Sequence, residues 1–156
     1  MIVIMLIRTN PFDLRTLVFA KHAQHVVLVH FPIALVLTAV AFDVVADWSK
    51  RRSLADAAYY NLLAAAISTL PVIATGMLAR QLLLQGQKLK GALLLHLILG
   101  SVSGGLIWLT WWVHFRARRK KEGLPSYRFA VEFLAGAVIV VTGHLGGFLS
   151  GVNMPG

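Results

Sequence analysis

Three histidines within apolar segments are the residues of this chain whose type and spacing could do chemistry: His30, His96 and His144. With the segment directions derived below, all three lie at one membrane surface, at a depth of roughly 6–12 Å for a helical rise of 1.5 Å per residue. Each imidazole inside a bilayer costs insertion energy, so chance would scatter histidines in depth. Any one alone could simply hydrogen-bond a carbonyl across the bundle. Several that converge between helices are typical of a metal or haem site.

The surroundings favour haem over a bare metal ion. Three histidines could hold zinc or copper, but no carboxylate accompanies them at that depth, and the neighbouring residues are apolar or small. The chain has no cysteine, which excludes thiolate sites and covalent attachment of a c-type haem. We therefore expect a b-type haem with two axial ligands among His30, His96 and His144, and with His25 as a further candidate ligand.

Small and basic residues would complete such a site. Glycines at positions 100, 143 and 147 would let a flat macrocycle approach, although they serve close helix packing equally well. Haem propionates at the nearby surface would need counter-charges, for which Arg80 is the first candidate. The glycines considered as cofactor contacts are Gly100, Gly143 and Gly147.

Two carboxylates, Asp43 and Glu132, occupy the opposite half of the apolar segments. An intramembrane carboxylate suggests a function such as proton transfer. Snorkelling ion pairs with the nearby Lys50 and Arg128 explain the presence of both carboxylates equally well. His114, at the same end, cannot by itself make a bis-histidine site, so a two-haem chain across the membrane is not expected.

The elements that must position these residues are membrane helices. The chain of 156 residues is 58% apolar and 13% charged, with a mean hydropathy of +0.74, which is typical of an integral membrane protein. Four apolar segments are long enough to cross a hydrocarbon layer of ~30 Å. Short connections predict a single all-α domain, an antiparallel up-down four-helix bundle, preceded by an interfacial helix within residues 1–24. The expected spans are about 26–46, 56–79, 91–115 and 129–152.

The basic residues predict the orientation of the bundle. The connections after the first and third spans carry nine of the fifteen lysines and arginines, which favours placing both connections in the cytoplasm. Both termini and the histidines then face the periplasm of a bacterial inner membrane. The net charge of +9 could suggest binding to nucleic acid, but the lysines and arginines cluster in short connections beside apolar segments, which argues against it. The nine residues are Lys50, Arg51, Arg52, Arg116, Arg118, Arg119, Lys120, Lys121 and Arg128.

Three motifs support a family resemblance: HFPIAL at His30, the histidine that opens the third span at His96, and TGHLGG around His144. With them, the chain resembles the predicted four-helix membrane proteins of domain of unknown function family 2231 over about residues 22–152. In that family's pattern a histidine precedes the HFP element, which matches His25, and the closing GG element matches Gly146 and Gly147. Relatives are fused or adjacent to periplasmic c-type cytochrome domains, which implies electron transfer on the outer face.

Our leading hypothesis is therefore a haem b-binding subunit for electron transfer at the periplasmic side of a larger respiratory or photosynthetic complex. The alternative is a cofactor-free accessory subunit that packs against such a complex. The chain has too few catalytic groups to be a complete enzyme. A transporter is not favoured, because neither an inverted repeat nor a polar pathway is evident.

Overall fold

The computed structural model describes residues 23–83 and 89–150, and its regular structure there is entirely helical. The predicted interfacial helix falls almost wholly on residues 1–22, outside the described part of the chain. The described helices are α2 (Ala23–Leu28), α3 (His30–Ser49), α4 (Arg52–Leu83), α5 (Gly91–Lys120) and α6 (Arg128–Leu149).

Four helical stretches are long and apolar enough to cross a membrane, at residues 24–49, 52–81, 91–120 and 128–149. This confirms the predicted all-α membrane bundle. The helices extend further into the basic connections than hydropathy suggested, because a helix ends where its backbone is capped and not where the hydrocarbon ends. Left-handed residues cap two of them: Lys50 after α3, at a φ of 55°, and Lys121 after α5, at 57°.

The two helix prolines act differently. Pro32 has no N–H to donate to the carbonyl of Leu28, and the first span is divided there into α2 and α3 at Val29. Pro71 lies inside α4, which continues unbroken to Leu83.

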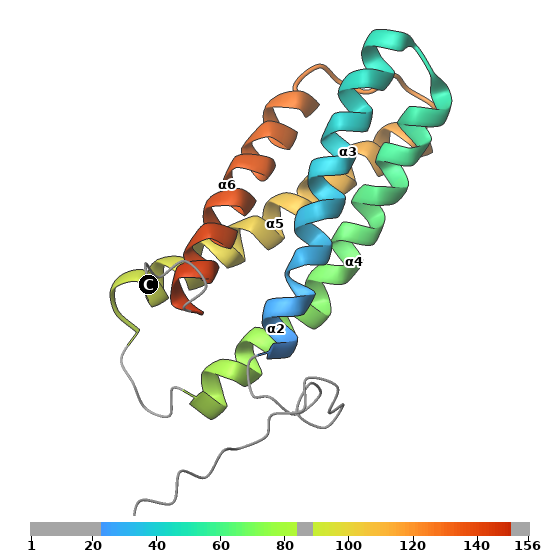
Figure 1. Cartoon of the computed structure of the whole chain (residues 1–156). Helices are drawn as coiled ribbons and strands as arrows, with labels where there is room; N and C mark the ends of the chain where they lie inside the picture. The colour runs from blue at the N-terminus through green and yellow to red at the C-terminus, as the bar shows by residue number, and fades with distance from the viewer. Residues whose placement is uncertain (1–22, 84–88, 151–156) are drawn as a thin grey trace, which may run out of the picture.

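Consecutive membrane helices run in opposite directions, as Figure 1 shows. Each of the four packs against two others: α3 lies against α4 and α6, and α5 lies against α6 and α4. The short α2 continues the first span against α4. The bundle therefore consists of two hairpins, α2–α4 and α5–α6, with α3 and α5 pointing the same way.

The two hairpins repeat one pattern of burial. Every buried residue of α3 has a buried counterpart in α5 that lies 71 positions later, and the left-handed caps Lys50 and Lys121 keep this spacing. Buried residues of α4 recur in α6 70 positions later. This repeat, related by an approximate two-fold axis along the bundle, was not predicted from the sequence. The first-helix pairs are Pro32 and Ser103, Val36 and Ile107, Ala39 and Thr110, Asp43 and His114, and Ala46 and Ala117; the second-helix pairs are Ala58 and Arg128, Leu62 and Glu132, Ala65 and Ala135, Ala66 and Gly136, and Thr69 and Ile139.

The core lies where the two hairpins meet and combines alanines with valine and isoleucine. Val36, Ala65, Ala66, Ile107 and Ile139 form one buried apolar cluster. Alanines in this cluster let the helix backbones approach closely, which is how helices gain packing energy in lipid. Most of the large apolar side chains point outward instead, as expected for a lipid-facing surface.

The first prediction concerns this close packing. Ala65→Leu places three further carbon atoms where the native side chain is completely buried, so we expect a loss of about 1–3 kcal/mol in stability. The adjacent Ala64 is exposed, and Ala64→Leu should leave stability nearly unchanged. Thermal unfolding of both variants in mild detergent, followed by tryptophan fluorescence, tests this. Equal melting temperatures for the two variants would refute the packing assignment.

Candidate functional site

Polar and titratable side chains gather at the two opposite ends of the bundle. The histidine end consists of α2, the start of α5 and the last turns of α4 and α6. The basic end consists of the α3–α4 and α5–α6 connections and the adjoining turns.

At the histidine end, His25 of α2 faces α4. Its Nδ1 donates to the carbonyl oxygen of Val72 over 3.0 Å and lies 3.4 Å from the hydroxyl of Thr75. The ring also packs against the next turn of α4, since a Cβ added at Gly76 would lie 2.9 Å from Cε1 of His25. Only glycine at position 76 gives the imidazole this room.

His96 of α5 makes the same contact with α6. Its Nδ1 donates to the carbonyl oxygen of Thr142 over 3.2 Å, and a Cβ added at Gly146 would lie 3.1 Å from Cε1 of His96. The carbonyl and the glycine are four residues apart on α6, as Val72 and Gly76 are on α4.

The two histidines are therefore equivalent positions of the repeat, 71 residues apart. A carbonyl oxygen can only accept, so each Nδ1 carries the proton and each neutral ring presents the lone pair of Nε2. Among the described residues, neither Nε2 atom takes part in a hydrogen bond. A fixed tautomer with Nε2 available is the arrangement found in metal-ligating histidines, which donate their other N–H to a carbonyl or carboxylate.

The other two candidate ligands lie elsewhere. His30 is exposed, and its Nδ1 donates over 2.7 Å to the carbonyl oxygen of Val26 in the same span. His144 is also exposed. The structure thus turns His25 and His96 toward neighbouring helices and turns His30 and His144 outward.

The glycines singled out from the sequence pack against aliphatic side chains where their contacts are described. A Cβ at Gly143 would lie 3.2 Å from Cδ1 of Ile33, and one at Gly100 would lie 3.9 Å from Cγ2 of Thr142. Gly147 is partly buried, and its carbonyl accepts a hydrogen bond from Ser150 over 3.0 Å. Arg80 is exposed in the last turn of α4, at the histidine end.

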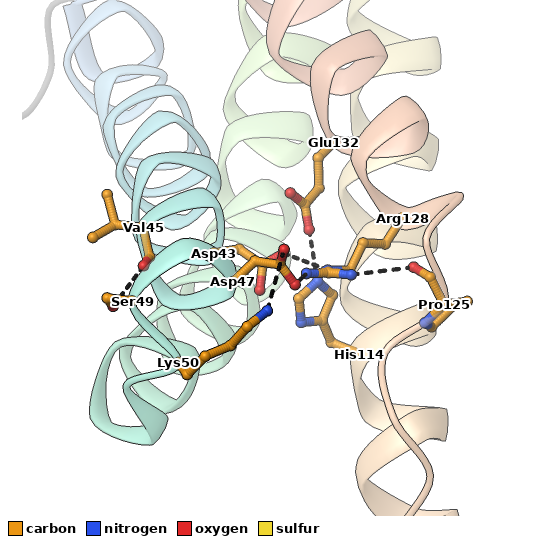
Figure 2. A network of polar contacts seen from close by, with 9 residues as sticks. All are labelled: Asp43, Val45, Asp47, Ser49, Lys50, His114, Pro125, Arg128 and Glu132. Atoms are coloured by element: carbon orange, nitrogen blue, oxygen red, sulfur yellow. Dashed lines mark hydrogen bonds and ion pairs between the residues drawn. The ribbon is translucent and has the colours of Figure 1, made fainter.

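The basic end holds a buried ion-pair network between the hairpins (Figure 2). Arg128 of α6 donates from Nε to Oδ2 of Asp43 over 2.6 Å and from Nη2 to Oδ1 of Asp47 over 2.9 Å, both on α3. Its guanidinium also lies 3.9 Å from the ring centroid of Phe129. Arg128 and Asp43 are 6% and 2% exposed, so this is an interior ion pair and not a snorkelling one. Of the two interpretations left open for Asp43, an ion pair is present, but it joins different helices in the interior of the bundle.

His114 and Glu132 continue this network. Their Nε2 and Oε1 atoms lie 2.7 Å apart, and the two residues are 2% and 1% exposed. The second carboxylate oxygen of Glu132, Oε2, is buried without a hydrogen-bond partner among the described residues. Ligand atoms of Asp43, His114 and Glu132, which come from α3, α5 and α6, lie within 4.8 Å of one another.

The sequence contained a signal for this second cluster that was not used. His114 lies 18 residues after His96, and Asp43 lies 18 residues after His25, which is five helical turns and hence the same helix face. Asp43 and His114 are 71 residues apart, as His25 and His96 are, so comparing the chain with itself at a shift of 71 residues matches Asp43 with His114. Considered singly, His114 looked isolated.

The four apolar helices and the buried polar network define a multi-pass helical membrane protein. A family model described as predicted membrane protein (DUF2231) matches residues 21–153, and the chain belongs to that family. The resemblance noted from HFPIAL, His96 and TGHLGG is thereby confirmed. No curated protein and no solved structure matched the chain.

The interior ion pair leads to a stability prediction. Arg128→Ala leaves Asp43 charged and unpaired in the bundle, which should cost about 3–5 kcal/mol. The double substitution Arg128→Met with Asp43→Leu removes both charges and should recover most of that loss. Lys120→Ala breaks only the exposed pair with Glu122 and should cost less than about 1 kcal/mol. Unfolding in detergent mixtures measures all three, and a similar loss for Arg128→Ala and Lys120→Ala would contradict the assignment.

Proposed function

We propose that this protein binds a b-type haem between its two hairpins, with His25 and His96 as the axial ligands, and serves in electron transfer. The observation that carries the proposal is the equivalence of these two histidines. Each comes from one hairpin, at the same position of the repeat, with its Nδ1 tied to a carbonyl and its ring against a glycine.

The residues present fit the chemistry of such a group. Low-spin haem is held by two imidazole nitrogens, and His25 and His96 would supply one from each hairpin. The carbonyls of Val72 and Thr142 hold each Nδ1 proton, so they orient the rings and raise the basicity of Nε2. Bound there, haem would supply one-electron oxidation and reduction.

The edge of the site is suited to propionates. Arg80 at the end of α4 and Lys90 just before α5 are exposed at the histidine end and can pair with carboxylates near the surface. In this proposal Gly76 and Gly146 give the ligands room, while Gly100 and Gly143 serve helix packing.

The proposed setting is a bacterial inner membrane, with the basic end in the cytoplasm and the histidine end at the periplasmic side. The excess of lysine and arginine in the α3–α4 and α5–α6 connections supports this orientation. The chain would act as a subunit of a larger respiratory or photosynthetic complex and not as an enzyme. A periplasmic c-type cytochrome is the proposed electron partner, as the family resemblance implies.

Spectroscopy of matched histidine variants tests the ligand assignment. In protein expressed with haem available, reduced-minus-oxidised spectra should show sharp low-spin α and β bands. His25→Ala or His96→Ala should abolish or broaden them, since an axial ligand is lost. His30→Ala and His144→Ala are the controls and should leave the bands unchanged, because both side chains point outward.

A colourless, folded wild-type protein would exclude haem and favour the alternative of a cofactor-free accessory subunit. Bands that survive His25→Ala but disappear in His30→Ala would assign the ligand to His30 instead.

The glycines allow a subtler test of the same geometry. Gly146→Ala puts a methyl group 3.1 Å from Cε1 of His96, so the ring must shift, and the bands should move or the midpoint potential change. Gly105→Ala on α5 meets no atom within 4 Å and is the matched control. Identical spectra and potentials for the two variants would show that His96 is not a ligand.

A further inference from the structure

The cluster of Asp43, His114 and Glu132 at the basic end plays no part in haem ligation and calls for its own explanation. The three side chains approach one another from α3, α5 and α6, as Figure 2 shows. We propose that these three residues bind a divalent first-row transition-metal ion, a site separate from the histidine end.

The spacing of the ligand atoms is suitable. One nitrogen and two carboxylate oxygens lie within 4.8 Å of one another. Atoms that share one ion lie at most twice a metal–ligand distance of about 2.0–2.2 Å apart, so closing by about half an ångström is enough. Changes of side-chain torsion accommodate such a shift without moving a helix.

The unpaired oxygen of Glu132 points independently to a ligand. Its side chain is 99% buried, since Glu132 is 1% exposed, and Oε2 has no hydrogen-bond partner among the described residues. A buried carboxylate oxygen left without a partner is costly. A cation bound between Glu132, His114 and Asp43 would satisfy it.

Of the three carboxylates in this network, Asp43 and Asp47 pair with Arg128, Asp47 also lies 3.9 Å from Lys50, and Glu132 pairs with His114. Arg128 bonds Oδ2 of Asp43 and so fixes the orientation of that carboxylate, as the outer partners of metal ligands do. A carboxylate has a second oxygen with which to coordinate.

The donor set selects the kind of ion. One imidazole with two carboxylates suits Zn²⁺, Fe²⁺ or Mn²⁺ better than Ca²⁺ or Mg²⁺, which prefer oxygen ligands alone. In the metal-free protein, one proton lies between Nε2 of His114 and Oε1 of Glu132. When the ion binds, that proton leaves to solvent and both atoms become free to coordinate.

Metal analysis of the full chain tests the site. Tag-free protein in mild detergent is stripped with a chelator, loaded with Zn²⁺, desalted, and analysed for bound zinc by mass spectrometry. We expect wild type to retain one ion with release of a proton, and Glu132→Gln and His114→Gln to lose it. Asp47→Asn is the matched control: it removes a carboxylate from the same network but none of the three ligands, so it should keep the ion.

X-ray absorption of zinc-loaded wild type provides a readout that needs no variant to fold. Scattering from a single imidazole with oxygen neighbours supports the site, whereas several imidazoles would assign the zinc to the histidine end and overturn the proposal. Failure of wild type to retain zinc would overturn it too and leave the cluster as an ion-pair network only. Equal zinc retention in Glu132→Gln and wild type, or equal loss in Asp47→Asn and Glu132→Gln, would also overturn it.

Discussion

The ion pair between Arg128 and Asp43 joins the two hairpins at a depth where neither charge can be left alone. In lipid, two apolar hairpin faces gain little by touching each other, because hydrocarbon tails solvate them equally well. A buried guanidinium that bonds two carboxylates of the opposite hairpin, Asp43 and Asp47, helps to specify which faces meet. The register of α6 against α3 follows, and with it the placement of Glu132 beside His114 and the approach of α5.

The same principle operates along the whole length of the bundle. Polar side chains within the spans pair across helices, as Ser103 does with Thr142 over 3.0 Å and as the indole of Trp108 does with Thr69 over 3.0 Å. Apolar contact between the hairpins combines alanines, which let the helix backbones approach, with Val36, Ile107 and Ile139. The histidine end follows this logic, since Gly76 and Gly146 are what allow two imidazoles to reach backbone carbonyls.

The bundle could be predicted from the sequence because hydropathy and the length of apolar segments are strong signals. The end of the bundle at which a residue lies could be predicted as well, and His25, His30 and His96 do lie at one end. The direction in which each side chain points could not be predicted. His25 and His30 are five residues apart, which is about 140° around a helix at 100° per residue, so the two cannot face the same neighbour, and only His25 turns toward another helix. The pairing of side chains from different helices could not be predicted either. Hydropathy places Asp43 and Glu132 near the cations of the connections, but it does not show that Arg128 pairs with Asp43 or that His114 pairs with Glu132.

The repeat of the hairpin has a consequence for which features of the bundle can be symmetric. In a symmetric pair of identical hairpins any charge would appear twice. An arginine at the place of Ala58 would meet Asp43 of the other copy, as Arg128 meets Asp43 here, and the same ion pair would occur in both halves. In one chain the two halves can differ, and Arg128 and Glu132 stand where the first hairpin has an alanine and a leucine. The asymmetric polar cluster is thus a property that only a single chain with two unequal hairpins can possess, whereas the paired histidines are equally compatible with a symmetric pair.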